Sequence, residues 1–148
     1  MPNNGASCEW ISWASPEYAL TVALRHEVLR VPLGLAFTLE QLASESNSHH
    51  LAAFYDEGHI LGCLMLTPHE GGEVQMRQVA VKPEMQGTGL GRTLVEEAER
   101  KAQALGFTRM MLHARDKAIG FYDRLGYARE GDLFTEVGIT HQQMAKKV

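Results

Sequence analysis

The sequence is poor in features that mark several classes of protein. It has only two cysteines, Cys8 and Cys63, far apart in the chain, so it is not a disulfide scaffold and suits a reducing compartment. No apolar run approaches the length of a membrane span, and the first ten residues lack the basic region and apolar core of a secretory signal. We therefore expect a cytoplasmic protein without a membrane partner.

Positive charge is also scarce. The chain has 14 Lys and Arg against 18 Asp and Glu, a formal charge of -4 at pH 7, and no basic run. This balance argues against nucleic acid as a partner. Only His49 and His50 of the seven histidines are adjacent, and no cysteine or further histidine stands near them at ligand spacing, so we expect no metal site.

The remaining composition is that of a globular protein. Of its 148 residues 45% are hydrophobic and 22% are charged, enough for one buried core without cross-links. We expect a single domain over residues 1–148.

The most informative stretch runs from Val74 to Gly106. It predicts a strand that ends at Pro83, a glycine-rich turn, and an amphipathic helix that stops at Gly106. The apolar positions of that helix recur near the 3.6-residue period and predict its buried face: Leu90, Leu94, Val95, Ala98, Ala102 and Leu105.

The turn itself predicts an anion site. Gly87, Gly89 and Gly91 can take positive φ and carry no Cβ, and the N-terminus of the following helix offers unpaired N–H groups. An anion beside Gly87 to Arg92, most simply a pyrophosphate, would be held by these groups and by the Arg92 side chain. The spacing fits neither the P-loop nor the dinucleotide fingerprint, and a tight turn without a ligand stays an alternative.

The other segments predict a mixed sheet. A strand at residues 8–13 precedes a helix from Ser15 to Arg30 and a shorter helix from Thr38. Two strands, 51–55 and 60–67, form a hairpin that leads into the Val74 strand, and a strand at 108–113 pairs parallel to it. A helix at 118–125 and a terminal strand pair complete the chain. The fold class is α/β (α+β), with a mostly antiparallel central sheet flanked by helices on both faces.

Two motifs carry a family resemblance. Gln86-Gly87-Thr88-Gly89-Leu90-Gly91 follows the strand end Val79-Ala80-Val81 and resembles the acyl-CoA pyrophosphate signature of the GNAT superfamily of N-acyltransferases. The segment from Ala118 to Tyr127 is similar to the second signature of that family, and the element order covers nearly the whole chain. The ending FTEVGITHQQM resembles ElaA-like members, with Thr140 where their pattern has proline.

The resemblance implies an acetyl-CoA-dependent N-acetyltransferase that moves the acetyl group directly to an amine of a small molecule or peptide. It implies that Tyr122 is the general acid, although a core tyrosine is the alternative, and that a homodimer is one expected assembly. Arg115 stands where many members have Asn, so either it pairs with a phosphate or that contact is missing. The cofactor residues so implied are Val79, Ala80, Val81, Gln86, Gly87, Thr88, Gly89, Leu90, Gly91, Arg92, Arg115 and Phe121.

The base and the acceptor site are less well determined. Glu136 and His141 are candidates for the base, and ordinary strand and turn residues are the equal alternative. Arg25 and Arg30, from the first helix, and Gln78 are candidates for binding a carboxylate-bearing amine, whereas Arg25 and its neighbour His26 could instead reach water. The rival functions are a catalytically silent CoA sensor or regulatory module and, more weakly, a nucleotide-binding protein.

Overall fold

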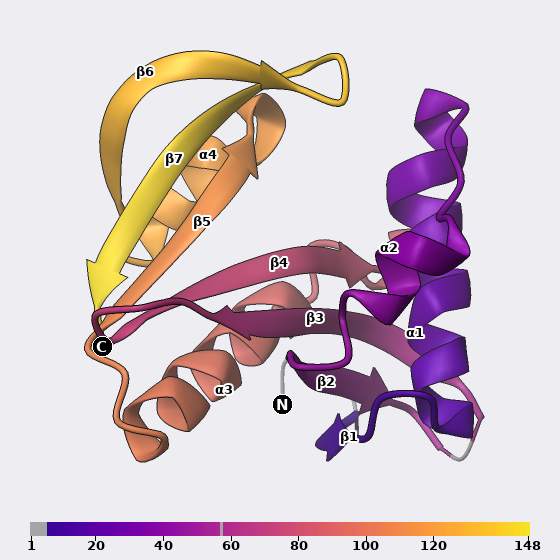
Figure 1. The fold of residues 1–148 in the computed structure, drawn as a ribbon. Coiled ribbons are helices and arrows are strands. Elements are labelled where there is room, and N and C mark those ends of the chain that lie inside the picture. Colours follow the sequence, from indigo (N-terminus) through magenta and orange to yellow (C-terminus); the bar gives the residue numbers. More distant parts are fainter. Residues whose placement is uncertain (1–5, 57) are drawn as a thin grey trace.

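A seven-stranded sheet runs through the molecule in the order β1-β2-β3-β4-β5-β7-β6 (Figure 1). The computed structural model describes residues 6–56 and 58–148, so Glu57 of the predicted hairpin turn and residues 1–5 lie outside the described part. β4 and β5 pair in parallel, as predicted, and the other pairs are antiparallel. The strands are β1 Ser7–Ile11, β2 His49–Phe54, β3 Ile60–Pro68, β4 Glu73–Val81, β5 Arg109–Arg115, β6 Ala128–Glu136 and β7 Ile139–Lys147.

Helices cover both faces of the sheet, which confirms the predicted fold class (Figure 1). Two separate cores mark the faces, one with Leu24 of α1 against Cys63 and Ala80, the other with Leu94 of α3 against Leu64 and Val74. No described helix is long and apolar enough to cross a membrane. The helices are α1 Pro16–Arg25, α2 Leu39–Ala43, α3 Leu90–Ala104 and α4 Ile119–Arg124.

The first helix is shorter than its sequence predicts. Ser15 caps α1 by accepting a hydrogen bond from the backbone N–H of Tyr18 at 3.1 Å, as its position suggests. The regular α-helix ends at Arg25, and a wider π-helical turn covers His26–Arg30. That turn inserts an extra residue and changes the direction of the side chains that follow it. Arg25, the last residue of α1, is buried, whereas its neighbour His26 is exposed.

The buried face of α3 agrees with the predicted stripe except at one position. Leu90, Leu94, Val95, Ala98 and Ala102 are 0% exposed. Leu105 was predicted to be buried but is 45% exposed, because the helix ends at Ala104.

The parallel strands β4 and β5 stay together only at their beginnings. They pair over Glu73 to Gln75 with Arg109 to Met111, and beyond these residues the two strands diverge (Figure 1). The sheet therefore opens between β4 and β5, and the helical turn that follows α1, with Leu29 and Arg30, lies at this opening.

A β-bulge in β4 lies at the opening. Arg77 pairs with Met65 and Ala80 pairs with Cys63, so Gln78 and Val79 stand opposite one residue of β3. Gln78 has a φ of 56°, which is unusual for a residue other than glycine. The extra residue reverses the alternation of side chains, turning Ala80 to the α1 face although Met76 faces α3.

Candidate active site

The gap between β4 and β5 forms a cleft with a volume of about 510 Å³. Its lining comes from the π-helical turn, β4, β5, α4 and the ends of β6 and β7, so it joins the two faces of the sheet. The cleft brings together seven residues that the sequence proposed for the site: Arg30, Gln78, Val79, Arg115, Tyr122, Glu136 and His141.

Tyr122 lies in this cleft with a hydroxyl that has no protein partner. The residue is only 6% exposed, and no hydrogen bond joins its hydroxyl to any described residue. Its ring is held edge-on by Phe121, with centroids 5.0 Å apart, and by Tyr127 at 5.7 Å. Burial raises the pKa of Tyr122, so the phenol stays protonated at neutral pH and can donate a proton into the cleft.

A carboxylate between two imidazoles lines the same cleft. Glu136, at the end of β6, has Oε2 3.1 Å from Nδ1 of His113 and Oε1 3.9 Å from Nε2 of His141. The ring of Phe134 packs edge-on against His113 at 5.0 Å and stacks on His141 at 5.8 Å. Glu136 and the two imidazoles can accept a proton from a ligand in the cleft. They lie close enough together for a charge on one group to be stabilised by the others.

The hydrogen bonds of His141 define which nitrogen is free. Its Nδ1 lies 2.9 Å from the carbonyl oxygen of Ile139, and a carbonyl can only accept, so Nδ1 carries the proton in the neutral ring. The Nε2 atom, which faces Glu136, is therefore the basic nitrogen.

His113 was missed by the sequence analysis. The alternation of β5 could have indicated it, because Leu112 and Ala114 belong to the buried core and His113 must then share the other face with Arg115. The sequence pattern could not indicate that Glu136, 23 residues away, is the partner of His113.

The glycine-rich turn leaves backbone donors unused. Within the described residues, no acceptor pairs with the backbone N–H of Gly87 or with those of Gly89 through Arg92. Gly87 and Gly89 have φ values of 81° and 92°, as glycines in such a turn can. This turn is therefore a cradle of free N–H groups at the N-terminus of α3, a setting that favours an anion.

Gly91 serves the cradle in another way. It lies inside α3 and does not take positive φ, contrary to the prediction, but a Cβ there would lie 3.4 Å from Cζ of Phe121 and 3.9 Å from Cγ2 of Val81. The missing side chain lets α3, α4 and the end of β4 approach one another. The two sequence motifs thus meet in space, although 30 residues separate Gly91 from Phe121.

The cradle and cleft suit a long phosphorylated cofactor with an extended arm. Beyond Gln75, the β5-facing edge of β4 has no strand partner among the described residues, so its main chain is available to pair with such an arm. The free N–H groups of the cradle lie after the end of this edge, and the Arg92 side chain, 67% exposed, stands beside them. An anionic head and an extended arm would therefore be held by different parts of one surface.

Arg25 is not a site residue, and its sequence-based assignment to the substrate is wrong. The side chain is 1% exposed and donates to Glu45 through Nη1 at 2.9 Å and Nη2 at 2.7 Å. Tyr18 donates its hydroxyl to the same carboxylate at 2.7 Å, and Nε2 of His50 lies 3.0 Å from the carbonyl oxygen of Glu45. We refer to Tyr18, Arg25, Glu45 and His50 as the α1 cluster.

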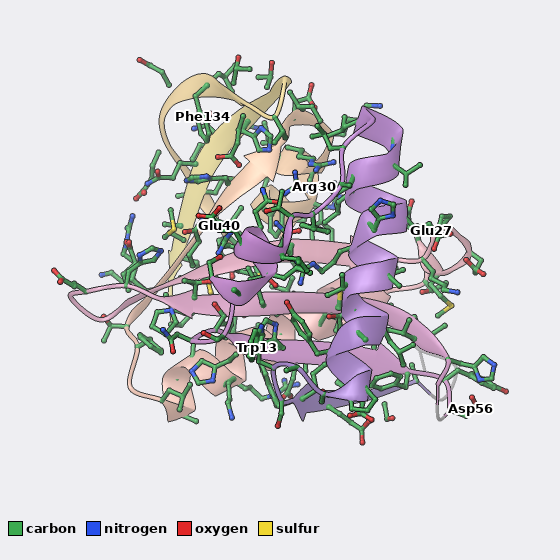
Figure 2. All side chains as sticks on the ribbon, turned by 45° about the vertical axis from the view of Figure 1, so that its right-hand side comes forward. Trp13, Glu27, Arg30, Glu40, Asp56 and Phe134 are labelled. Atoms are coloured by element: carbon green, nitrogen blue, oxygen red, sulfur yellow. The ribbon has the colours of Figure 1, made fainter. Side chains whose placement is uncertain are left out.

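Arg30 and Arg115 lie together on the α1 side of the cleft. Figure 2 shows Arg30 near the end of the first helix, toward the C-terminal strands. Arg115 donates from Nη2 to the carbonyl oxygen of Leu29 at 3.3 Å, and its strand neighbour Ala114 belongs to the opposite, α3 face. This placement does not support the assignment of Arg115 to a cofactor phosphate, because the cradle belongs to α3.

Comparisons with known proteins agree with this geometry. The Acetyltransferase (GNAT) family matches residues 9–127. The chain is similar to the "Uncharacterized N-acetyltransferase YitI" of Bacillus subtilis (strain 168), with 26% identity over 125 residues, 80% of this chain and 83% of that protein. Among solved structures it resembles an acyl-CoA N-acyltransferase from Pseudomonas aeruginosa, with a TM-score of 0.81, 26% identity, and 95% and 99% of the two chains covered.

The predicted resemblance to ElaA is confirmed at the level of the fold. Escherichia coli ElaA superposes with a TM-score of 0.79 at 16% identity, over 95% of this chain and 99% of that one. The family match, the splayed parallel strands and the glycine cradle lead to one assignment: the chain belongs to the GNAT family of acetyltransferases.

Proposed function

We propose that the protein is an acetyl-CoA-dependent N-acetyltransferase that moves an acetyl group directly to the amine of a small molecule or peptide. Acetyl-CoA supplies the thioester that the amine attacks and the thiolate that leaves. The single observation that carries the proposal is the unpartnered hydroxyl of the buried residue Tyr122, in a cleft that Glu136 also lines.

The chain's own residues divide the proton transfers between the two sides of the cleft. An alkyl amine with a pKa of about 10.4 is protonated at neutral pH and must lose a proton before it can attack. Glu136, supported by His113 and His141, is the proposed proton acceptor. Tyr122, whose pKa is raised by burial, holds the proton that the leaving sulfur needs.

Cofactor binding is proposed to use two parts of the structure. The unpaired N–H groups from Gly87 to Arg92 and the Arg92 side chain would hold the pyrophosphate, and Gln86 fixes the loop by donating from Nε2 to the carbonyl oxygen of Val81 at 3.3 Å. The free edge of β4 from Val79 to Val81 would pair with the pantetheine arm. A CoA sensor would need the cradle but would have no use for an unpartnered phenol, so we favour the enzyme.

The cradle can be tested with two matched charge reversals on α3. Arg92 and Arg100 are 67% and 64% exposed, and each pairs with a glutamate of the same helix. Only Arg92 lies in the first turn, beside the cradle. In calorimetry with acetyl-CoA, Arg92→Glu should raise the Kd about 10-fold or more, whereas Arg100→Glu should leave it nearly unchanged.

The outcomes of this titration are distinct. Arg92→Glu loses the exposed ion pair with Glu96 and places two glutamates four residues apart, which costs the helix only a few tenths of a kcal/mol, and the helix dipole partly offsets this cost. Weaker binding by this variant would therefore not reflect unfolding. If the wild type binds neither acetyl-CoA nor CoA, the proposed function is wrong. If both variants bind equally well, the cradle is in the wrong place.

A further inference from the structure

The arginines of the cleft indicate the class of acceptor, an inference that rests on the proposed function. Within the described residues, five arginines make ion pairs with carboxylates: Arg25, Arg92, Arg100, Arg109 and Arg129. Four make none, and three of these, Arg30, Arg77 and Arg115, line the cleft. The unpaired guanidinium groups are therefore concentrated at the site where the acceptor would bind.

Each of the three arginines comes from a different element and is held by an uncharged contact. The Arg30 guanidinium lies 4.5 Å from the ring centroid of Phe37. Arg77 donates from Nη1 to the hydroxyl of Thr67 at 3.3 Å. Arg115 donates from Nη2 to the Leu29 carbonyl oxygen, also at 3.3 Å. A guanidinium has five N–H donors, so most of them stay available to a ligand, and partly fixed side chains lose less entropy when they bind one.

Positively charged side chains outnumber negatively charged ones in the cleft. Glu136 is the only carboxylate among the described residues that line it, and its two oxygens face His113 and His141. Burial and the nearby charge of Arg30 lower the pKa of Arg115, while Glu136 opposes this effect. The chain as a whole has a formal charge of -4, so the positive cleft does not follow from composition.

We propose that the acceptor is an amine that also carries a carboxylate or phosphate group, which Arg30, Arg77 and Arg115 bind while the amino group lies beside Glu136. A planar carboxylate or a phosphate can accept paired hydrogen bonds from a guanidinium, which fixes the orientation of the ligand as well as its position. Arg77 and Arg115 come from the two diverging strands, and both line the cleft.

Binding to the CoA-loaded protein tests this inference before any turnover. Calorimetry would compare 4-aminobutyrate with butylamine, and phosphoethanolamine with ethanolamine, two pairs in which one member carries an anionic group and the other lacks it. The anionic member of at least one pair should bind about 10-fold more tightly or better. The pair that shows the larger ratio identifies the anion as carboxylate or phosphate. A thiol-release assay with acetyl-CoA should show the same preference in kcat/KM.

Matched variants locate the preference in the cleft. Arg77→Gln and Arg115→Gln should reduce the anionic-to-neutral ratio to near one by raising the Kd of the anionic amine, and Arg77→Lys should restore part of it. Arg124→Gln is the control, because Arg124 also makes no ion pair among the described residues but lies exposed on α4, outside the cleft. Unchanged acetyl-CoA affinity in each variant shows that it is folded.

Two results would overturn the inference. One is that neutral amines bind and react as well as their anionic counterparts, which would leave the acetyltransferase proposal intact. The other is that Arg124→Gln reduces the ratio as much as Arg77→Gln does. Failure of the proposed function itself would be recognised separately, by the absence of any acetyl-CoA binding.

Discussion

Tyr18 and Tyr122 are buried to the same degree, each 6% exposed, yet their hydroxyl groups are in opposite situations. The Tyr18 hydroxyl donates to Glu45 at 2.7 Å, and the same carboxylate accepts two hydrogen bonds from Arg25. The Tyr122 hydroxyl has no partner among the described residues and opens into the cleft. A polar group of a buried residue normally has a partner, so an unpartnered hydroxyl that opens into a cleft is a candidate for binding a ligand.

The arginines of the α1 cluster and of the cleft differ in the same way as the two tyrosines. Arg25 has both terminal nitrogens on one carboxylate, whereas Arg30, Arg77 and Arg115 have no ion-pair partner in the described residues. Polar residues of one kind therefore stabilise the fold in the first region and remain available for chemistry in the second. The exposed fraction of a side chain does not distinguish a stabilising role from a role in the cleft. The number of its ion-pair and hydrogen-bond partners within the protein does.

Breaking the α1 cluster should have the largest effect on stability. Arg25→Leu leaves the Glu45 carboxylate, 3% exposed, without its ion pair. We expect the free energy of unfolding, measured with urea, to fall by about 3–5 kcal/mol. Arg92→Leu breaks an exposed pair and should cost at most about 1 kcal/mol. Equal losses in the two variants would show that the buried pair has no special role.

Removing one hydroxyl from the α1 cluster should have an intermediate effect. Tyr18→Phe deletes the 2.7 Å hydrogen bond to Glu45 and should lower the free energy of unfolding by about 1–3 kcal/mol, with kcat nearly unchanged. Tyr122→Phe deletes no such bond and should not destabilise the fold. The comparison fails if the two variants lose the same stability in urea.

The smallest expected effect is on how the free energy of unfolding depends on pH. Burial lowers the pKa of His50 below its ordinary 6.5, so between these two values the unfolded chain binds more protons than the folded protein does. The stability that His50 contributes is complete above pH 6.5 and is lost as the pH falls through the folded-state pKa. Urea titrations at several pH values should show this loss, and His50→Gln should reduce it. A variant with the same acid loss as the wild type would exclude His50.

Local patterns predicted the elements and part of the site. The strand, turn and helix from Val74 to Ala104 follow from neighbouring residues, since Pro83 ends the strand and the apolar spacing defines the helix. Tyr122 was identified by its motif, and its unpartnered hydroxyl supports the role given to it. That the terminal strands bring Glu136 next to His113, 23 residues earlier in the chain, was not predictable from spacing alone.

What the sequence could not show depends on contacts between distant segments. Arg25 was assigned to the site because its helix face carries titratable residues, but its partner Glu45 is 20 residues away, beyond α2. Nothing near Gln75 indicates that β4 and β5 part there, because that divergence is a property of the strand pair and the bulge at Gln78. The π-helical turn that positions Arg30 has no local signal that we recognise.

The Tyr122 hydroxyl is the proposed catalytic acid, and one variant tests this role directly. Tyr122→Phe keeps the ring and its contacts and removes only the proton donor. In a thiol-release assay with acetyl-CoA and an accepted amine, kcat should fall by about 100-fold or more, while the Kd for acetyl-CoA changes less than about twofold. An unchanged kcat, or a fall in kcat matched by an equal loss of acetyl-CoA affinity, would contradict this role.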